Sequence, residues 1–291
     1  MTENLLAARG AVVVGGSRGI GRAVAELLAA CGAGVVVNGR DPDAVAETTE
    51  AITASGGRAV GLAGSAHVEA TAVALVEACR EEYGSVDVLI NCAGVAEPPG
   101  SSILSVSTEQ FQDLLDAHVG TAFQTCRAAA PIMVEQRRGS IVNSGSVAFL
   151  GDYGGTGYPA GKGAVNGLTM AVAAELAPYG VRANVVCPGA KTRLSTGDDY
   201  ETHIRDLNAR GLLDEMSMRA SLDPAPADYV APLYAYLASD LSAGVSGSLF
   251  LASGGFVGRF ERAVPAVLGY RDHQRFSPWT IEEMHTMVAG G

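Results

Sequence analysis

Aromatic and basic residues are scarce in this sequence: 6% of its 291 residues are aromatic, and 20 Lys and Arg face 31 Asp and Glu. The net charge of −11 disfavours nucleic acid as a partner, because a phosphate backbone needs a basic surface. No run reaches the ~18 apolar residues of a membrane span, and residues 1–10 carry no apolar core of a signal peptide. We therefore expect a cytoplasmic protein with no membrane partner.

Cysteine is also sparse, and its copies are scattered through apolar segments. They are Cys31, Cys79, Cys92, Cys126 and Cys187. An odd, unclustered set predicts reduced core thiols and argues against a disulfide framework or a metal site. Hydrophobic residues, at 48%, and the 37 Gly are abundant, a composition that suits a buried sheet with closely packed helices.

Apolar β-branched runs alternate with helical periodicity along the chain. Strands are expected near residues 11–14, 34–38, 58–63, 86–90, 141–142, 181–186 and 247–252. Helices are expected near residues 22–30, 42–55, 68–83, 111–134, 157–177 and 229–237. This alternation predicts an α/β fold: a single doubly wound parallel sheet with helices on both faces. The sixth strand is expected to break at Cys187-Pro188-Gly189.

A glycine-rich turn follows the first strand and opens the first helix. Its spacing, G-x-x-x-G-x-G, lets the backbone approach a dinucleotide pyrophosphate at the helix N-terminus. The predicted cofactor-binding residues of this turn are Gly15, Ser17, Arg18, Gly19, Ile20 and Gly21. The alternative is a tight strand-to-helix turn that binds nothing.

The end of the second strand indicates which dinucleotide binds. NAD sites usually place a carboxylate there for the ribose 2′-hydroxyl, whereas this chain has Gly39 followed by Arg40. Arg40 and Arg18, converging on the ribose, would suit a 2′-phosphate, so NADP is predicted over NAD. The alternative is that Arg40 is a solvated loop residue.

Tyr158 and Lys162 lie four residues apart at the start of a predicted helix, and therefore on one face of it. A phenol has an unperturbed pKa of about 10, which a nearby ammonium lowers toward the range useful for proton transfer. Ser146, at the end of the preceding strand, would hold the substrate oxygen while Tyr158 gives or takes its proton. Taken alone, the spacing also fits a solvated helix face.

Five motifs in order resemble the short-chain dehydrogenase/reductase superfamily over residues 8–255. They are the glycine turn, the segment with Asn91, Ala93 and Gly94, then Ser146, Tyr158-x-x-x-Lys162, and Pro188-Gly189. The resemblance implies a Rossmann-like sheet of about seven strands with catalysis at its carboxyl ends. It places Asn91 as a support of the central strand, and Pro188 and Gly189 beside the nicotinamide carboxamide. It also places Lys162 on the nicotinamide ribose and in a proton relay to Tyr158.

Two departures from the family pattern bear on the site. Gly64 and Ser65 stand where an Asp usually borders the adenine. His118 stands where the family has an Asn that distorts its helix and holds a relay water. An imidazole there would add an ionisation between about pH 6 and 8, unless His118 only packs in the helix. Histidine at this position resembles the hydroxyacyl-CoA dehydrogenase part of multifunctional β-oxidation enzymes.

The resemblance, together with the NADP preference predicted from Gly39 and Arg40, implies an NADP(H)-dependent oxidoreductase that interconverts a ketone and a secondary alcohol on a small molecule. A (3R)-hydroxyacyl thioester is the alternative substrate, and a dinucleotide-binding sensor or scaffold with little turnover is the alternative of another class. Residues 1–255 would form the catalytic domain, with 190–226 shaping the substrate cleft. Residues 256–291 would pack on the core or on a neighbouring subunit of a homo-oligomer, a dimer or tetramer.

Overall fold

The computed structural model describes residues 4–153, 155–193 and 195–289. Positions 1–3, 154, 194 and 290–291 fall in the predicted catalytic domain, its cleft-shaping segment and the C-terminal extension, and they lie outside the described residues. The chain divides into two compact units, Met1–Phe260 and Glu261–Gly291. The first unit carries the whole sheet and every predicted site residue.

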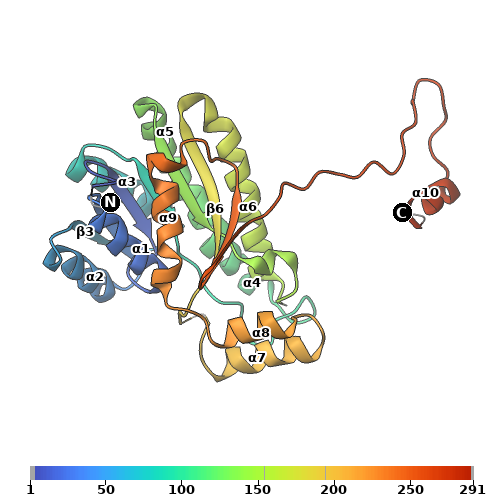
Figure 1. Ribbon diagram of the computed structural model, residues 1–291, viewed down its shortest axis with the longest axis horizontal. Helices are drawn as coiled ribbons and strands as arrows, with labels where there is room; N and C mark the ends of the chain where they lie inside the picture. Colours follow the sequence, from blue (N-terminus) through green and yellow to red (C-terminus); the bar gives the residue numbers. More distant parts are fainter. Residues whose placement is uncertain (1–3, 154, 194, 290–291) are drawn as a thin grey trace. The chain divides into compact units, whose positions relative to one another are not determined.

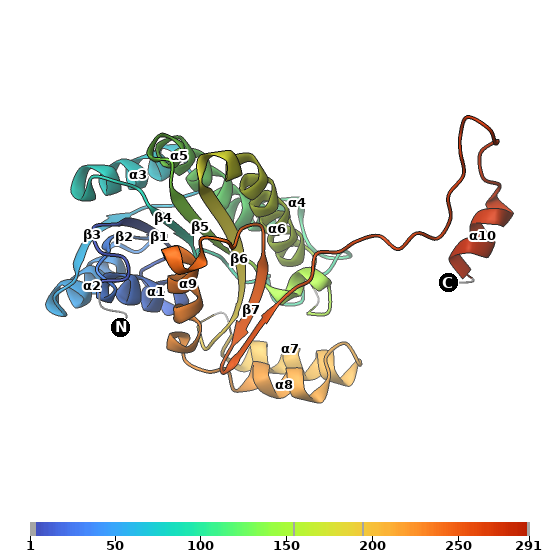
Figure 2. The ribbon, with the colours of Figure 1, turned by 45° about the horizontal axis from the view of Figure 1, so that its top comes forward.

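One sheet forms the centre of the first unit, in the order β3-β2-β1-β4-β5-β6-β7-β8 (Figure 2). Its strands are β1 (Gly10–Val14), β2 (Gly34–Gly39), β3 (Arg58–Ala63), β4 (Val88–Asn91), β5 (Gly139–Ser144), β6 (Val181–Gly189), β7 (Leu249–Ser253) and β8 (Phe256–Arg259). The first seven are parallel, which confirms the predicted doubly wound fold, and the order reverses between β1 and β4. The sheet has eight strands rather than seven, because 256–259, assigned by sequence to the extension, returns antiparallel along β7.

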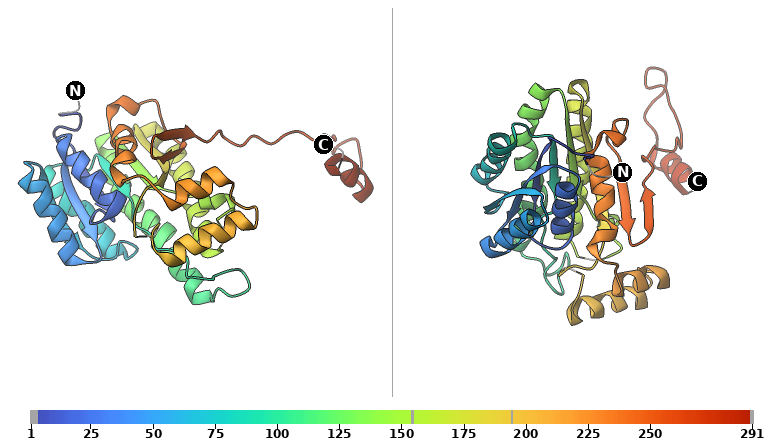
Figure 3. Two further views of the ribbon diagram at one scale, coloured as in Figure 1. Left: turned by 60° about the horizontal axis from the view of Figure 1, so that its bottom comes forward. Right: turned by 60° about the vertical axis from the view of Figure 1, so that its left-hand side comes forward.

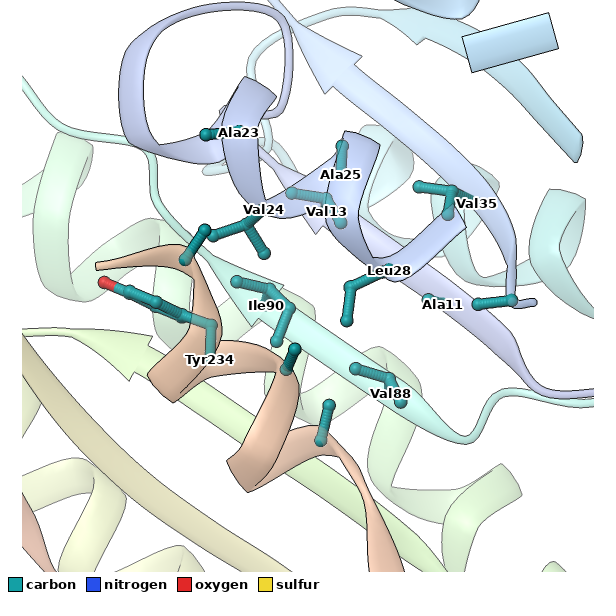
Figure 4. Close-up of a cluster of buried hydrophobic side chains, with 14 of the residues drawn as sticks. Ala11, Val13, Ala23, Val24, Ala25, Leu28, Val35, Val88, Ile90 and Tyr234 are labelled. Carbon is teal, nitrogen blue, oxygen red and sulfur yellow. The ribbon is translucent and has the colours of Figure 1, made fainter. Parts of the chain in front are cut away.

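Helices cover both faces of this sheet (Figure 1). The α-helices of the first unit are α1 (Gly19–Ala30), α2 (Pro42–Ala54), α3 (Glu69–Tyr83), α4 (Thr108–Leu115), α5 (Thr121–Gln136), α6 (Gly157–Leu176), α7 (Asp198–Ala209), α8 (Glu215–Leu222) and α9 (Ala231–Ala238). Of these, α7 and α8 lie beyond the carboxyl end of the sheet instead of on a face (Figure 1 and Figure 2). Strand side chains alternate between the faces. Val13 therefore packs with α1, α2 and α9, the cluster drawn in part in Figure 4, whereas Val12 packs with α3, α5 and α6.

Two elements near the site differ from the expectation. The helix predicted over 111–134 is two helices joined by a π-helical turn at Asp116–Gly120, a widening that apolar periodicity does not record. β6 continues through Pro188 to Gly189 instead of breaking there. Beyond Val186 this strand pairs with β7 alone, so it tolerates a residue that lacks a backbone N–H.

The segment between β6 and α9 contains α7 and α8, two helices that the sequence pattern did not resolve. They lie side by side (Figure 3) and enclose a small core in which Ile204 and Leu207 are fully buried. Tyr153, in the loop before α6, packs against this core. Its carbonyl oxygen accepts a hydrogen bond from His203 Nε2 at 2.9 Å. The helix pair is thereby attached to the loop that leads into α6.

At the amino edge of the sheet, one buried carboxylate ties several segments together. Asp87 accepts hydrogen bonds from the backbone N–H of Gly10 at 3.0 Å and from the Ser85 hydroxyl at 2.5 Å. It also forms ion pairs with Arg9 at 3.2 Å and Arg138 at 2.6 Å. Burial raises the pKa of Asp87, but the bonds from Ser85 and Gly10 and the two guanidiniums outweigh burial and hold it below its usual value.

The second unit contains α10 (Ile281–Ala289), which buries none of its side chains. The guanidinium of Arg271 lies 3.7 Å from the Trp279 ring centroid and pairs with Glu283 at 2.6 Å. Large apolar side chains are exposed in this unit, namely Val264, Val267, Leu268, Tyr270, Phe276, Ile281, Met284 and Val288. No side chain of residues 261–289 is buried, so this described part of the unit forms no core of its own.

All five cysteines are free thiols, and four of them are buried. Within the described ranges, no group of three or more His, Cys, Asp or Glu side chains is placed to hold a metal ion. No helix in the described part of the chain is long and apolar enough to cross a membrane.

Candidate active site

The turn between β1 and α1 has the geometry of an anion cradle. Gly15 and Gly19 have positive φ values, 73° and 53°, which L side chains rarely adopt. A Cβ at Gly15 would lie 2.6 Å from the Ala93 nitrogen, and one at Gly21 would lie 2.1 Å from the Gly15 oxygen. No side chain caps α1, and its first turn carries no acidic residue. Its N-terminal N–H groups, Ile20 among them, therefore suit a dinucleotide phosphate.

Around the end of β2, the structure shows an ion pair that the sequence analysis did not predict. A Cβ at Gly39 would lie 2.2 Å from Ser17 Oγ, so a carboxylate at this position would require Ser17 to shift. Arg40 is exposed and has no partner among the described residues. Arg18 forms an ion pair with Asp41, the N-cap of α2, which directly follows Arg40. A ligand phosphate would therefore meet Arg40 directly and would compete with Asp41 for Arg18.

The end of β3 carries the two residues predicted beside the adenine. Gly64 has φ 150°, and its carbonyl accepts a hydrogen bond from Asn38 Nδ2 at 3.1 Å. The Ser65 hydroxyl lies 3.0 Å from His67 Nδ1. Gly64 and Ser65 are both half-buried at the carboxyl edge of the sheet. They do not belong to the cluster around Tyr158 that is described below.

Asn91 is buried at the end of β4, and its side chain holds neighbouring elements together by hydrogen bonds. Its Nδ2 donates to Asn143 Oδ1 at 2.8 Å, and its Oδ1 accepts from the Thr125 hydroxyl at 3.0 Å. These bonds join β4 to β5 and α5. Gly94 follows in the loop, where a Cβ would lie 3.2 Å from His118 Nδ1 and 3.7 Å from Lys162 Nζ. His118 Nδ1 and Lys162 Nζ therefore both lie close to the same position beside Gly94.

Ser146, Tyr158 and Lys162 come together at the carboxyl end of β5. The ammonium of Lys162, only 5% exposed, lies 5.7 Å from the Tyr158 ring centroid and donates to the Ser144 carbonyl at 2.9 Å. Burial lowers the pKa of Lys162 to about 8. Burial also raises the pKa of Tyr158, while a hydrogen bond with Ser146 lowers it in part. The phenol pKa thus lies above its usual value in this arrangement, contrary to the lowering expected from the Tyr–Lys spacing.

His118 lies in the π-helical turn and is 3% exposed. Its Nε2 lies 3.1 Å from the Val95 carbonyl oxygen, and because a carbonyl only accepts, Nε2 carries the proton. Its Nδ1 is therefore a buried acceptor, with no hydrogen-bond partner among the described residues. Burial, with the nearby Lys162 charge, lowers the pKa of His118 to about 3. The ionisation expected between pH 6 and 8 is thus wrong for this residue, since the imidazole is neutral there.

Pro188 and Gly189 end β6 at the same edge and are half-buried. The structure therefore gathers His118, Gly94, Ser146, Tyr158 and Lys162 into one cluster. The glycine turn, Arg40, Gly64 and Ser65 lie along the edge at the ends of β1, β2 and β3. Sequence reasoning missed Glu97, whose carboxylate accepts a hydrogen bond from the backbone N–H of Tyr158. No motif marks it, because the backbone N–H groups that donate to it lie about 60 residues away along the chain.

A family model described as short chain dehydrogenase matches residues 9–199. The chain belongs to the short-chain dehydrogenase family. It is 33% identical over 247 residues to a 3alpha-hydroxysteroid dehydrogenase of Mediterraneibacter gnavus, covering 84% of this chain and 95% of that protein. It is 33% identical over 255 residues to a 3-oxoacyl-acyl-carrier-protein reductase of Synechocystis, covering 87% and 98%.

The solved structure of a short chain dehydrogenase from Mycobacterium avium matches this dehydrogenase fold with a TM-score of 0.80. The two share 29% sequence identity, and the match covers 98% of this chain and 95% of that one. Family membership makes the protein an oxidoreductase that acts on a CH–OH or carbonyl group, with NAD(P) as the cofactor that the family binds.

Proposed function

We propose that the protein interconverts a ketone and a secondary alcohol with NADP(H), using Tyr158 as general acid and base. The observation that carries this proposal is the buried Lys162 ammonium beside the Tyr158 ring, bonded to a carbonyl and lacking a carboxylate partner among the described residues. A buried, unpaired ammonium is unfavourable for stability alone and is typical of a site tuned for proton transfer.

Each residue of the cluster has a distinct role in this proposal. The nicotinamide, when bound, supplies or accepts the hydride. The Ser146 hydroxyl holds the substrate oxygen, and the Tyr158 hydroxyl transfers its proton to that oxygen in reduction and takes it back in oxidation. The Lys162 ammonium favours the phenolate that remains after transfer. His118 serves as a neutral acceptor that receives a hydrogen bond from Lys162 through one water, instead of titrating.

Arg40 and the absence of a carboxylate at Gly39 support NADP(H) as the cofactor. The free guanidinium of Arg40 would pair with the 2′-phosphate. Gly15, Gly19 and Gly21 would hold the pyrophosphate, and Gly64, Ser65, Ala93, Gly94, Pro188 and Gly189 would line the rest of the dinucleotide. Arg18 would contribute only to the extent that the phosphate displaces Asp41.

The relatives support a carbonyl as the substrate group, since one is a 3-oxoacyl-acyl-carrier-protein reductase and another a 3alpha-hydroxysteroid dehydrogenase. A free ketone is our first choice, and a (3R)-hydroxyacyl thioester is the alternative. The α7–α8 pair would shape the cleft that distinguishes them. Consumption of NADPH with a panel of cyclic ketones, linear ketones and 3-oxoacyl thioesters tests the proposal. Tight NADPH binding without turnover on any member would favour a sensor or scaffold instead.

We also propose a cytoplasmic homo-oligomer, a dimer or tetramer, in which the C-terminal unit packs on the catalytic unit or on a neighbouring subunit. The exposed apolar side chains of residues 264–288 support this packing, because an isolated unit of this size cannot bury them. Light scattering of the full chain and of a chain ending at Phe260 would test whether the unit takes part in assembly.

A further inference from the structure

The carboxylate of Glu97 reaches across from the β4–α4 loop to the start of the helix that carries Tyr158. Its Oε2 accepts from the Tyr158 N–H at 2.5 Å, and its Oε1 accepts from the N–H groups of Thr156 and Gly157, both at 3.2 Å. The Ser101 hydroxyl donates to Oε1 at 2.7 Å, which orients the carboxylate from its other side.

These bonds account for the free donors in the first turn of α6. A helix leaves its first N–H groups without intrahelical partners, and a side chain at the N-cap usually satisfies some of them. The N-cap here, Thr156, makes no such side-chain bond. Pro159 has no N–H, and the N–H of Ala160 bonds to the Thr156 carbonyl at 3.3 Å. The remaining donors all point to Glu97.

The surrounding residues leave room for this contact and keep the carboxylate charged. Gly155 has φ 76°, and a Cβ there would lie 2.8 Å from Glu97 Cγ. Burial raises the pKa of Glu97, but hydrogen bonds from Ser101 and the three N–H groups outweigh burial and hold it below its usual value. The negative charge also lies at the positive end of the helix dipole.

We propose that Glu97 is a positioning residue for catalysis: it caps α6 from the β4–α4 loop and thereby fixes Tyr158 against Ser146. The same loop carries Gly94, which lies beside His118 and Lys162. Glu97 therefore connects the loop next to these two residues with the helix start that carries Tyr158. The catalytic part of this inference rests on the proposed function; the capping part does not.

Hydrogen exchange of the full-length protein, without cofactor or substrate, tests the cap independently of turnover. Glu97→Gln keeps the size of the side chain but removes the charge and one acceptor. We expect the amides of residues 156–158 to exchange about tenfold faster in this variant, the scale of losing a helix cap. The matched control is Glu175→Gln, which changes an exposed carboxylate near the other end of α6 that has no partner among the described residues. This variant should leave the amides of residues 156–158 unchanged.

The catalytic part is tested with whichever carbonyl the unmodified protein reduces. We expect Glu97→Gln to lower kcat by about tenfold with little change in the KM for NADPH, and Glu97→Ala to lower kcat further, since small displacements of a reacting group strongly slow proton transfer. Unchanged exchange at residues 156–158 in Glu97→Gln would overturn the cap. Faster exchange with an unchanged kcat would overturn the positioning role. If the unmodified protein reduces nothing, the proposed function fails while the exchange result still decides the cap.

Discussion

The imidazole of His118 stands edge-on to the phenol ring of Tyr158, with ring centroids 4.9 Å apart and planes at 88°. The same imidazole donates a hydrogen bond from Nε2 to the Val95 carbonyl. Its Nδ1 lies near the position beside Gly94 that Lys162 Nζ also approaches. It is therefore both a packing surface for the reacting phenol and a fixed acceptor near the ammonium. These two roles lead to separate predictions.

The first prediction concerns activity. His118→Asn should keep turnover within about tenfold, because an amide also offers an acceptor, whereas His118→Ala should lose about 10- to 100-fold by freeing the Tyr158 ring. The pH–rate profile between pH 6 and 8 should be the same for His118→Asn and the unmodified protein, since burial lowers the pKa of His118 to about 3. An ionisation in this range that disappears in His118→Asn would contradict the neutral imidazole.

The second prediction concerns stability in acid. The pKa of His118 is about 3 in the folded chain against 6.5 in the unfolded chain, so below pH 6.5 the unfolded chain binds a proton that the folded chain does not. The free energy of unfolding therefore decreases as the pH is lowered below 6.5, by roughly 1.4 kcal/mol per pH unit. Between pH 7 and 5, the free energy of unfolding should decrease by about 2 kcal/mol more in the unmodified protein than in His118→Asn. Urea titrations at both pH values measure this difference, and parallel losses in the two proteins would refute it.

The third prediction concerns the cofactor. Arg40→Asp should weaken NADPH binding by roughly 1.5–3 kcal/mol, the value of hydrogen bonds to a charged group. Asp41→Asn should strengthen NADPH binding relative to NADH, because it releases Arg18 while an Asn can still cap α2. Asp43→Asn, in the first turn of the same helix, is the control. Fluorescence titrations with both cofactors measure the ratios, and equal affinities in the unmodified protein would exclude the preference.

The fourth prediction separates stability from catalysis. Asp87→Asn should lower the free energy of unfolding by about 3–5 kcal/mol, because it leaves buried donors and two guanidiniums without their charged partner. Asp240→Asn, which affects an exposed partner of Arg9, should change it by less than about 1 kcal/mol. The Asp87 contribution is present above the unfolded pKa and lost as pH falls through the lower folded pKa. A small effect of Asp87→Asn at neutral pH would show that the network is dispensable.

Local sequence patterns predicted the fold well. Runs such as 11–14 read as strands because β-branched residues buried on both faces suit a parallel sheet. The turn with Gly15 and Gly19 was predictable because its spacing encodes a backbone shape. The eighth strand was not, since 256–259 forms a strand only by pairing with β7.

The site was predictable as a set of positions but not as a set of contacts. Tyr158 and Lys162 could be placed on one helix face from their spacing. The pairing of Arg18 with Asp41, 23 residues away, and the contact of Glu97 with Tyr158, 61 residues away, depend on the tertiary fold. The depressed pKa of His118 likewise comes from burial that residue type alone does not reveal.

The most direct test of the account is turnover by Tyr158→Phe. This change removes the hydroxyl proposed to exchange a proton with the substrate and keeps the ring that packs on His118. We expect kcat for NADPH-dependent ketone reduction to fall by 10²–10⁴-fold, typical of losing a general acid, while the affinity for NADPH stays within about threefold. A Tyr158→Phe protein that binds NADPH normally and reduces the ketone at nearly the unmodified rate would contradict the central claim.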